Sequence, residues 1–194
     1  YANKNLTTGE GGMVVTQNQK LYEKCRYFKN VCFPLDGKRE FIHKHVGFNY
    51  RMSNLHAAIG LAQVEKAYDY RDQRIKNNAF YNQRLGHVEG ITFPEDEAES
   101  LNVHWMNAVL IDPDIFGMSR DQVIEALNLK GIETRLLFSG MHEQPALKNI
   151  GCDCSGEYLV TKDLTRKGLY LPSASSLSEN QIEYICSALL SMKK

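Results

Sequence analysis

Lys4 is the residue of this chain whose type and setting could do covalent chemistry. It stands near the start of residues 3–12, a glycine-rich stretch that reads Asn-Lys-Asn-Leu-Thr-Thr-Gly-Glu-Gly-Gly and leads into the strand-like residues 13–16. A lysine amine becomes a nucleophile when burial or a neighbouring cation disfavours its charged form, and it can then form an imine with a carbonyl compound. The glycines let the backbone pass close to a bound cofactor, because they carry no Cβ. The alternative is a solvated hairpin lysine, since most lysines lie at the surface.

The same stretch resembles the lysine loop of the DegT/DnrJ/EryC1/StrS family, whose members are pyridoxal phosphate-dependent aminotransferases that act on keto sugars linked to nucleotides. Three further blocks follow in the order and spacing of that family, and the four together span nearly the whole chain. These blocks are Gly-Phe-Asn-Tyr-Arg-Met-Ser-Asn at residues 47–54 with residues 57–63 behind it, Gly-Ile-Glu-Thr-Arg at residues 131–135, and Gly-Leu-Tyr-Leu-Pro-Ser at residues 168–173. Within the family, the resemblance is to the perosamine synthase-like branch of sugar 4-aminotransferases.

The resemblance implies roles for individual residues. Lys4 would hold the cofactor through the imine and move protons at the reacting carbon. Asn49 matches an asparagine that reaches across a dimer interface to the partner's cofactor phosphate, and an amide suits this task because it donates to an anionic oxygen without carrying a charge. Arg135 and His142 fall in the region that the family places near the sugar nucleotide, where an arginine can bind a diphosphate through two hydrogen bonds. On the residues alone, Asn49 is a turn asparagine and Arg135 a salt-bridge partner, while Arg51 either orders its loop or binds phosphate.

The alternation of strand-like and helical segments predicts an α/β protein. The resemblance makes the chain the C-terminal part of a fold type I pyridoxal phosphate-dependent transferase. Residues 1–86 would be the C-terminal part of the large cofactor-binding domain with a linking helix, and residues 87–194 would be the small α/β domain. The patterns predict helices at residues 18–30, 53–85 with a kink, 119–130, 157–167 and from 178 onward, strands at residues 13–16, 91–93, 103–111, 132–138 and 169–171, and long loops at residues 31–46 and 139–156.

The composition argues against several classes of protein. Lys+Arg and Asp+Glu balance at 23 each, so nothing indicates a nucleic-acid partner or a polybasic membrane surface. No apolar run approaches the roughly 20 residues needed to span a bilayer, and the sequence does not predict a signal peptide. Since about half of the family's sequence precedes the lysine, the chain reads as the C-terminal portion of a longer protein. As a fragment it is expected to be inactive and to bind pyridoxal phosphate weakly.

The cysteines and histidines do not predict a metal site. The chain has five cysteines, and an odd number without a regular framework indicates reduced thiols and a cytoplasmic setting. Cys152 and Cys154 are separated by one residue, whereas zinc sites space their cysteines by two or more residues and need two further ligands. His43 and His45 lie in a basic loop without a carboxylate cluster. The basic side chains of residues 38–44 could instead face a phosphate group on a neighbouring subunit.

These patterns and the resemblance predict an aminotransferase that moves an amino group from glutamate or a similar donor to a nucleotide-linked 4-keto-6-deoxy sugar, acting as a homodimer with shared active sites. Residues 136–140, Leu-Leu-Phe-Ser-Gly, differ from the proline- and tyrosine-rich loop of the sugar aminotransferases and look like the C3-deoxygenating dehydrases of the same superfamily. Those dehydrases place histidine where Lys4 stands, so Lys4 favours transamination. The alternatives are a sugar dehydrase and, if the chain is naturally this short, an inactive interaction domain. Trp105 is expected in the core or in an interface rather than as a platform for a base.

Overall fold

A computed structural model describes residues 1, 3–37 and 41–193 of the chain. The chain forms two compact units, Tyr1–Ala67 and Tyr68–Lys194, which are described separately below as the first and the second unit. The division falls after the first residue of the long helix α3 (Ala67–Leu85), so the rest of that helix belongs to the second unit. The sequence analysis places the boundary between the large and the small domain after residue 86, and this boundary stays a prediction.

The first unit contains two helices that begin where the sequence predicts. In α1 (Gln19–Lys29), the side chain of Asn18 accepts a hydrogen bond from the backbone nitrogen of Leu21 at 3.1 Å. In α2 (Asn54–Glu65), the side chain of Ser53 accepts one from the backbone nitrogen of His56. Such caps satisfy backbone donors that have no partner within the helix. Helix α2 ends at Glu65 and α3 begins at Ala67, so the kink predicted within residues 53–85 is confirmed as a break between two helices at Lys66.

The strand predicted at residues 13–16 is wrong. These residues are irregular, and the side chains of Met13, Val14 and Val15 are exposed. A strand forms only where a second strand takes up its backbone groups, and in the described part of the first unit the only such pairing is a bridge between Asn30 and Asn49. The loop predicted at residues 31–46 is confirmed where the structure describes it, and Lys38 and Arg39 lie outside the described residues.

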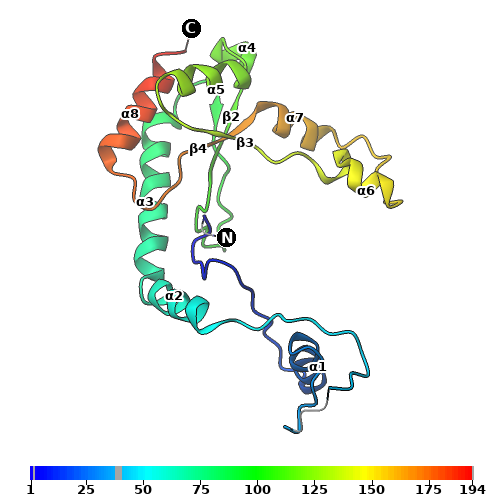
Figure 1. Cartoon of the computed structure of the whole chain (residues 1–194). Helices are drawn as coiled ribbons and strands as arrows, with labels where there is room; N and C mark the ends of the chain where they lie inside the picture. Colours follow the sequence, from blue (N-terminus) through cyan, green and yellow to red (C-terminus); the bar gives the residue numbers. More distant parts are fainter. Residues whose placement is uncertain (2, 38–40, 194) are drawn as a thin grey trace. The chain divides into compact units, whose positions relative to one another are not determined.

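The second unit is built on a four-stranded antiparallel sheet, which confirms the predicted α/β class (Figure 1). The strand order is β1-β2-β4-β3, so the long central pair is made by segments far apart in the sequence. The strands are β1 (Ile91–Thr92), β2 (Asn107–Ile111), β3 (Arg135–Leu136) and β4 (Gly168–Leu171). Strands β1, β2 and β3 are shorter than predicted. Strand β2 starts late because the chain bends at His104, which has a φ of 43° and donates its backbone N–H to Asn102 Oδ1.

Three helices enclose the core on one face of this sheet. They are α3, α5 (Arg120–Leu129) and α8 (Glu179–Leu190). Helices α5 and α8 begin at Ser119 and Ser178, as the sequence predicts, and the structure shows a capping box at each start. Apolar side chains at helical and alternating-strand spacing meet in a single cluster. Its fully buried members include Tyr81, Leu85, Val109, Ile111, Phe116, Val123, Leu127, Leu169, Leu171, Ile182, Cys186 and Leu189.

Several short elements lie where no regular structure was predicted. Helix α4 (Pro113–Phe116) begins at Asp112, has proline in its first turn and ends at Gly117 in the left-handed conformation. The predicted loop at residues 139–156 contains a 3₁₀ turn (Met141–Glu143) and α6 (Pro145–Asn149). Helix α7 (Leu159–Lys167) then contacts β2 and leads into β4.

Polar side chains on one face of α3 hold the chain where it leaves β4. Arg74 Nη1 donates to the carbonyl oxygens of Trp105 and Ser173, both at 2.8 Å. Asn77 Nδ2 donates to the carbonyl of Ala174 at 3.1 Å, and the Tyr81 hydroxyl donates to the carbonyl of residue 172 at 3.1 Å. Three successive carbonyl groups are thus bound by one helix face, which satisfies acceptors that would otherwise be costly to bury.

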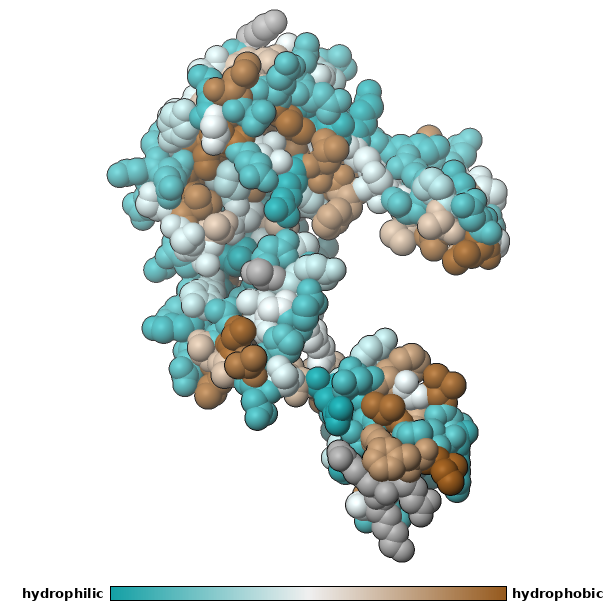
Figure 2. Space-filling model, viewed as in Figure 1, coloured by the Kyte–Doolittle hydropathy of each residue, from teal (hydrophilic) through white to brown (hydrophobic). Residues whose placement is uncertain are grey.

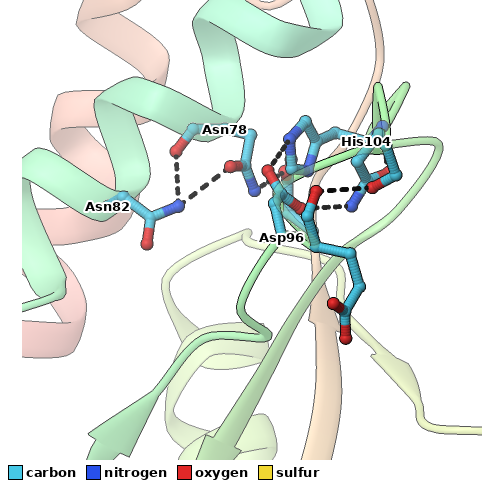
Figure 3. Close-up of polar contacts among 8 residues, drawn as sticks. Asn78, Asn82, Asp96 and His104 are labelled. Carbon is cyan, nitrogen blue, oxygen red and sulfur yellow. Dashed lines mark hydrogen bonds and ion pairs between the residues drawn. The ribbon is translucent and has the colours of Figure 1, made fainter.

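A second polar group ties α3 to β2 (Figure 3). Asn78 Nδ2 donates to Asn107 Oδ1 at 3.0 Å, and Asn82 Nδ2 donates to both oxygens of Asn78. The figure also shows the loop before β2, where Asp96 lies 3.2 Å from His104 Nε2. These contacts fix the start of β2 against the helix.

The ion pair between α3 and α8 predicts a pH dependence of stability. Arg84 binds Glu183 through Nε at 2.7 Å and Nη2 at 2.5 Å, and this hydrogen bonding lowers the pKa of Glu183 from its ordinary value of 4.5. A carboxyl whose pKa is lower in the folded state stabilises the fold above the unfolded pKa and loses that contribution as pH falls through the folded pKa.

We therefore expect the difference in free energy of unfolding between the wild type and Glu183→Gln to be largest near pH 7 and to shrink below about pH 4.5. Chemical denaturation at a series of pH values measures it. The exposed Glu179→Gln, in the first turn of the same helix, is the matched control. A difference that stays constant between pH 7 and pH 3 would contradict the assignment.

Candidate active site

The loop that carries Lys4 is held by short-range hydrogen bonds. Gly9 donates its backbone N–H to Thr7 Oγ1 at 2.9 Å, and Thr8 Oγ1 donates to the carbonyl of Glu10 at 2.7 Å. Gly9 has a φ of 83°, in the left-handed region that only glycine adopts without strain. The predicted glycine-rich turn is therefore present, and the Lys4 side chain is exposed beside it.

This loop rests on helix α2 and on the block that contains Asn49. A Cβ added at Gly60 would lie 2.8 Å from Thr8 Cγ2, closer than real Cβ contacts allow. A Cβ added at Gly11 would lie 2.7 Å from Thr8 Oγ1 and 3.3 Å from the Met52 side chain. The absence of a side chain at Gly60 therefore lets the Lys4 loop pack closely against α2.

Asn49 is presented by a segment paired with the end of α1. Phe48 donates its backbone N–H to the carbonyl of Phe28 at 2.8 Å, and Asn30 and Asn49 form a bridge. Arg51 Nε donates to Asn49 Oδ1 at 2.8 Å, and Arg51 Nη1 donates to Asn30 Oδ1 at 3.2 Å. Arg51 thus orders this loop, which was one of its two predicted roles.

The contact with Arg51 also fixes the orientation of the Asn49 amide. A guanidinium only donates, so the oxygen of the amide must face Arg51 and the nitrogen must point away. Asn49 is exposed, and its Nδ2 makes no hydrogen bond to any residue that the structure describes. The side chain therefore presents two N–H donors to an acceptor outside this segment.

The two other predicted site residues lie in the second unit. Arg135 is exposed on β3, directly opposite Tyr170, and within the described ranges it makes no ion pair. His142 lies in the 3₁₀ turn, where its ring stacks on Tyr158 with centroids 4.2 Å apart. Its Nε2 is buried and has no hydrogen-bond partner among the residues described. A Cβ at Gly140 would collide with this ring, so the glycine makes room for the stack.

The structure thus groups the candidates in pairs, with Lys4 and Asn49 in the first unit and Arg135 and His142 in the second. The roles of all four stay predictions. Sequence reasoning missed Tyr158, whose left-handed φ of 46° turns it onto His142. No local pattern signals this contact.

Another lysine, Lys167, lies beside two carboxylates and has a structural role. Lys167 Nζ lies 3.1 Å from Asp112 Oδ2 and 3.3 Å from Asp163 Oδ2. Hydrogen bonds to these two carboxylates raise the pKa of Lys167, and the same bond to Lys167 lowers the pKa of Asp112. Lys167 is therefore held in its charged form, which is not nucleophilic.

Neither a metal centre nor a membrane span is seen in the part of the chain that the structure describes. No group of three or more His, Cys, Asp or Glu side chains there could hold a metal ion. No helix among the described residues has the length and apolar character needed to cross a bilayer.

Comparison with known proteins gives a consistent set of matches. The model of the DegT/DnrJ/EryC1/StrS aminotransferase family matches residues 1–190. A GDP-perosamine synthase from Escherichia coli O157:H7 is 33% identical over 189 residues, which cover 97% of this chain and 49% of that protein. A GDP-perosamine synthase from Caulobacter vibrioides is 34% identical over 190 residues, which cover 97% of this chain and 50% of that protein.

A solved structure shares the fold. The crystal structure of DesI in the presence of its TDP-sugar product matches with a TM-score of 0.84 and 27% identity, and covers 99% of this chain and 48% of the DesI chain. The chain spans about half the length of the curated relatives it matches.

The contact between Gly60 and Thr8 generates a prediction about stability. In a helix, replacing glycine by alanine ordinarily stabilises a protein by about 1 kcal/mol. We expect Gly60→Ala to be destabilising instead, because the new methyl group meets Thr8 Cγ2. Thr8→Ser removes that carbon, so Gly60→Ala in the Thr8→Ser background should recover the ordinary stabilisation.

Chemical denaturation of the four proteins of this double-mutant cycle measures the coupling between the two positions. If Gly60→Ala changes the free energy of unfolding by the same amount in both backgrounds, the loop does not pack on α2 as described.

Proposed function

Because the chain belongs to the DegT/DnrJ/EryC1/StrS aminotransferase family, we propose that its protein transfers an amino group from an amino acid, glutamate or a similar donor, to a nucleotide-linked 4-keto-6-deoxy sugar. The observation that carries this proposal is Lys4 in a glycine turn packed on α2, within a chain about a third identical to two GDP-perosamine synthases. The family depends on pyridoxal phosphate, and the proposal extends to the whole protein.

The residues present fit that cofactor. Lys4 supplies an exposed amine on a loop whose Gly9 and Gly11 leave the backbone open, and the Asn49 amide presents N–H donors suited to a phosphate. Beside Lys4, Asn5 Oδ1 is buried and has no hydrogen-bond partner among the described residues, so a donor there would satisfy it. When bound, pyridoxal phosphate supplies an electron sink that stabilises negative charge on the carbon next to the amino group.

Each of the candidate residues of this chain would then have a separate role. Lys4 would anchor the cofactor and take up and return the proton at the reacting carbon through Nζ. Asn49, oriented by Arg51, would donate to the phosphate of the cofactor held by the partner subunit of a homodimer. Arg135 and His142 would contact the nucleotide-linked sugar.

A sugar dehydrase of the same superfamily is the second candidate, favoured by residues 136–140. Lys4 argues against it, because a lysine that anchors the cofactor is what amino transfer requires. Formation of an amino sugar from the keto sugar and glutamate would decide between the two functions, since a dehydrase releases no amino sugar.

The role of Lys4 is tested by labelling. We expect borohydride reduction of the complete protein with pyridoxal phosphate, followed by peptide mass analysis, to place the pyridoxyl group on Lys4. Lys4→Ala should lose both the label and the activity, whereas the exposed Lys20→Ala, on α1, should retain them. A label on any other lysine would overturn the assignment.

The role of Asn49 is tested with mixed dimers. If Asn49 acts across the subunit interface, a dimer of one Lys4→Ala subunit and one Asn49→Ala subunit carries both defects in one site and an intact second site. We expect such dimers, formed from two inactive or weakened parents, to regain up to about half of the wild-type activity per dimer, as one of two sites is intact. Activity no higher than that of either parent homodimer contradicts a shared site.

A further inference from the structure

The sheet of the second unit has a face that looks away from the core. In β4, Leu169 and Leu171 are buried in the core, so Tyr170 between them points to the other face. Tyr170 lies directly opposite Ala108 on β2 and Arg135 on β3. Residues directly opposite each other on antiparallel strands share a face, so this outer face carries an aromatic ring beside an exposed cation.

Two more aromatic side chains extend this face. The Phe138 ring lies 5.5 Å from the Tyr170 ring in an edge-on arrangement, and the Trp105 ring stacks on Phe138 at 6.4 Å with an interplanar angle of 27°. Phe138 is 66% exposed, whereas Trp105 and Tyr170 are half-buried. The aromatic platform, defined as Trp105, Phe138 and Tyr170, therefore keeps a large ring surface in water at the edge of the unit.

Hydrogen bonds from α3 hold the backbone of the platform at Trp105. Arg74 is buried, with 8% of its surface exposed, and its Nη1 binds the carbonyl of Trp105 and that of Ser173. The Ser173 hydroxyl in turn accepts from the backbone N–H of Asn107, two residues after Trp105. The backbone of Trp105 is thus fixed to α3 and to the end of β4. A binding surface that is ordered before the ligand arrives loses less conformational entropy on binding.

We propose that this platform stacks the base of the nucleotide-linked substrate and that Arg135 binds its diphosphate. The inference rests on the function proposed above and names the part of the substrate that the second unit recognises. Every nucleobase has a π face that stacks on aromatic side chains, and a guanidinium binds phosphate oxygens through paired hydrogen bonds. Neighbouring strands lie about 4.8 Å apart, so the backbone of Arg135 runs beside that of Tyr170 on the same face. Charge and shape therefore match a nucleoside diphosphate.

This reading differs from the expectation for Trp105. The sequence analysis predicts that Trp105 lies in the core or in an interface rather than in a platform for a base. The structure instead takes residues 103–106 out of the strand and sets the ring against an exposed phenylalanine.

Trp105 provides a fluorescent probe of the platform, because it is the one tryptophan in this sequence. The complete protein is titrated with guanosine diphosphate and, in parallel, with thymidine diphosphate, while tryptophan fluorescence is recorded. The fluorescence of the Trp105→Phe variant is subtracted from that of the wild type, which removes the signal of any other tryptophan in the complete protein. We expect the emission of Trp105 to change on binding of the diphosphates, and the free nucleosides to change it at higher concentration.

The variants separate the two parts of the site. Phe138→Ala should raise the Kd for both diphosphates at least about fivefold, the loss that follows from one stacking contact. Arg135→Gln should raise the Kd for the diphosphates but not that for the nucleosides. Leu129→Ala, which truncates another exposed apolar side chain, on α5, is the control and should change the Kd of neither the diphosphates nor the nucleosides.

The proposal is overturned if Phe138→Ala binds both diphosphates as the wild type does, or if inorganic pyrophosphate alone changes the Trp105 emission as fully as the diphosphates do. Assay of amino transfer in the same variants distinguishes a failure of the platform proposal from a failure of the proposed function. If the wild type aminates nucleotide-linked sugars and Phe138→Ala has an unchanged KM, the platform proposal is wrong and the proposed function stands. If the wild type neither binds nucleotides nor transfers amino groups, both proposals are wrong.

Discussion

The second unit depends on the hydrogen bonds that one face of α3 makes to the chain between β4 and α8. Arg74, Asn77 and Tyr81 bind three successive carbonyl groups there, and Asn78 reaches β2 through Asn107. A buried carbonyl without a donor costs about 1–3 kcal/mol, so these side chains are required once the segment is enclosed. The apolar cluster drives the packing of helices on the sheet, while the polar contacts decide which part of the chain lies against α3.

The first unit is organised differently. Its two helices contain no buried residues, and apolar side chains of α2 such as Leu55, Leu61 and Val64 are exposed. Figure 2 shows apolar side chains, in brown, on the surface of this unit as well as on the second. Lys4 and Asn49 are therefore placed by contacts between loops and helix ends.

Most of the fold could be predicted from local patterns. The caps at Asn18, Ser53, Ser119 and Ser178 fix the starts of four helices, because each depends on a few adjacent residues. The irregular structure of residues 13–16 could not be predicted, since strand formation depends on a partner strand that local sequence does not show. Strand order also escaped prediction, because β2 pairs with β4 across most of the second unit.

The candidate site shows the same limit. Lys4 and Asn49 can be proposed from sequence because their neighbours along the chain, the glycines and Arg51, are also their neighbours in space. The aromatic platform joins residues before β2, after β3 and within β4, so only the assembled sheet brings it together. Arg74, which anchors it, looks from sequence like one more charged residue on a solvated helix face. The proposed covalent role of Lys4 is thus encoded locally, whereas the proposed recognition of the substrate depends on the tertiary contacts of α3.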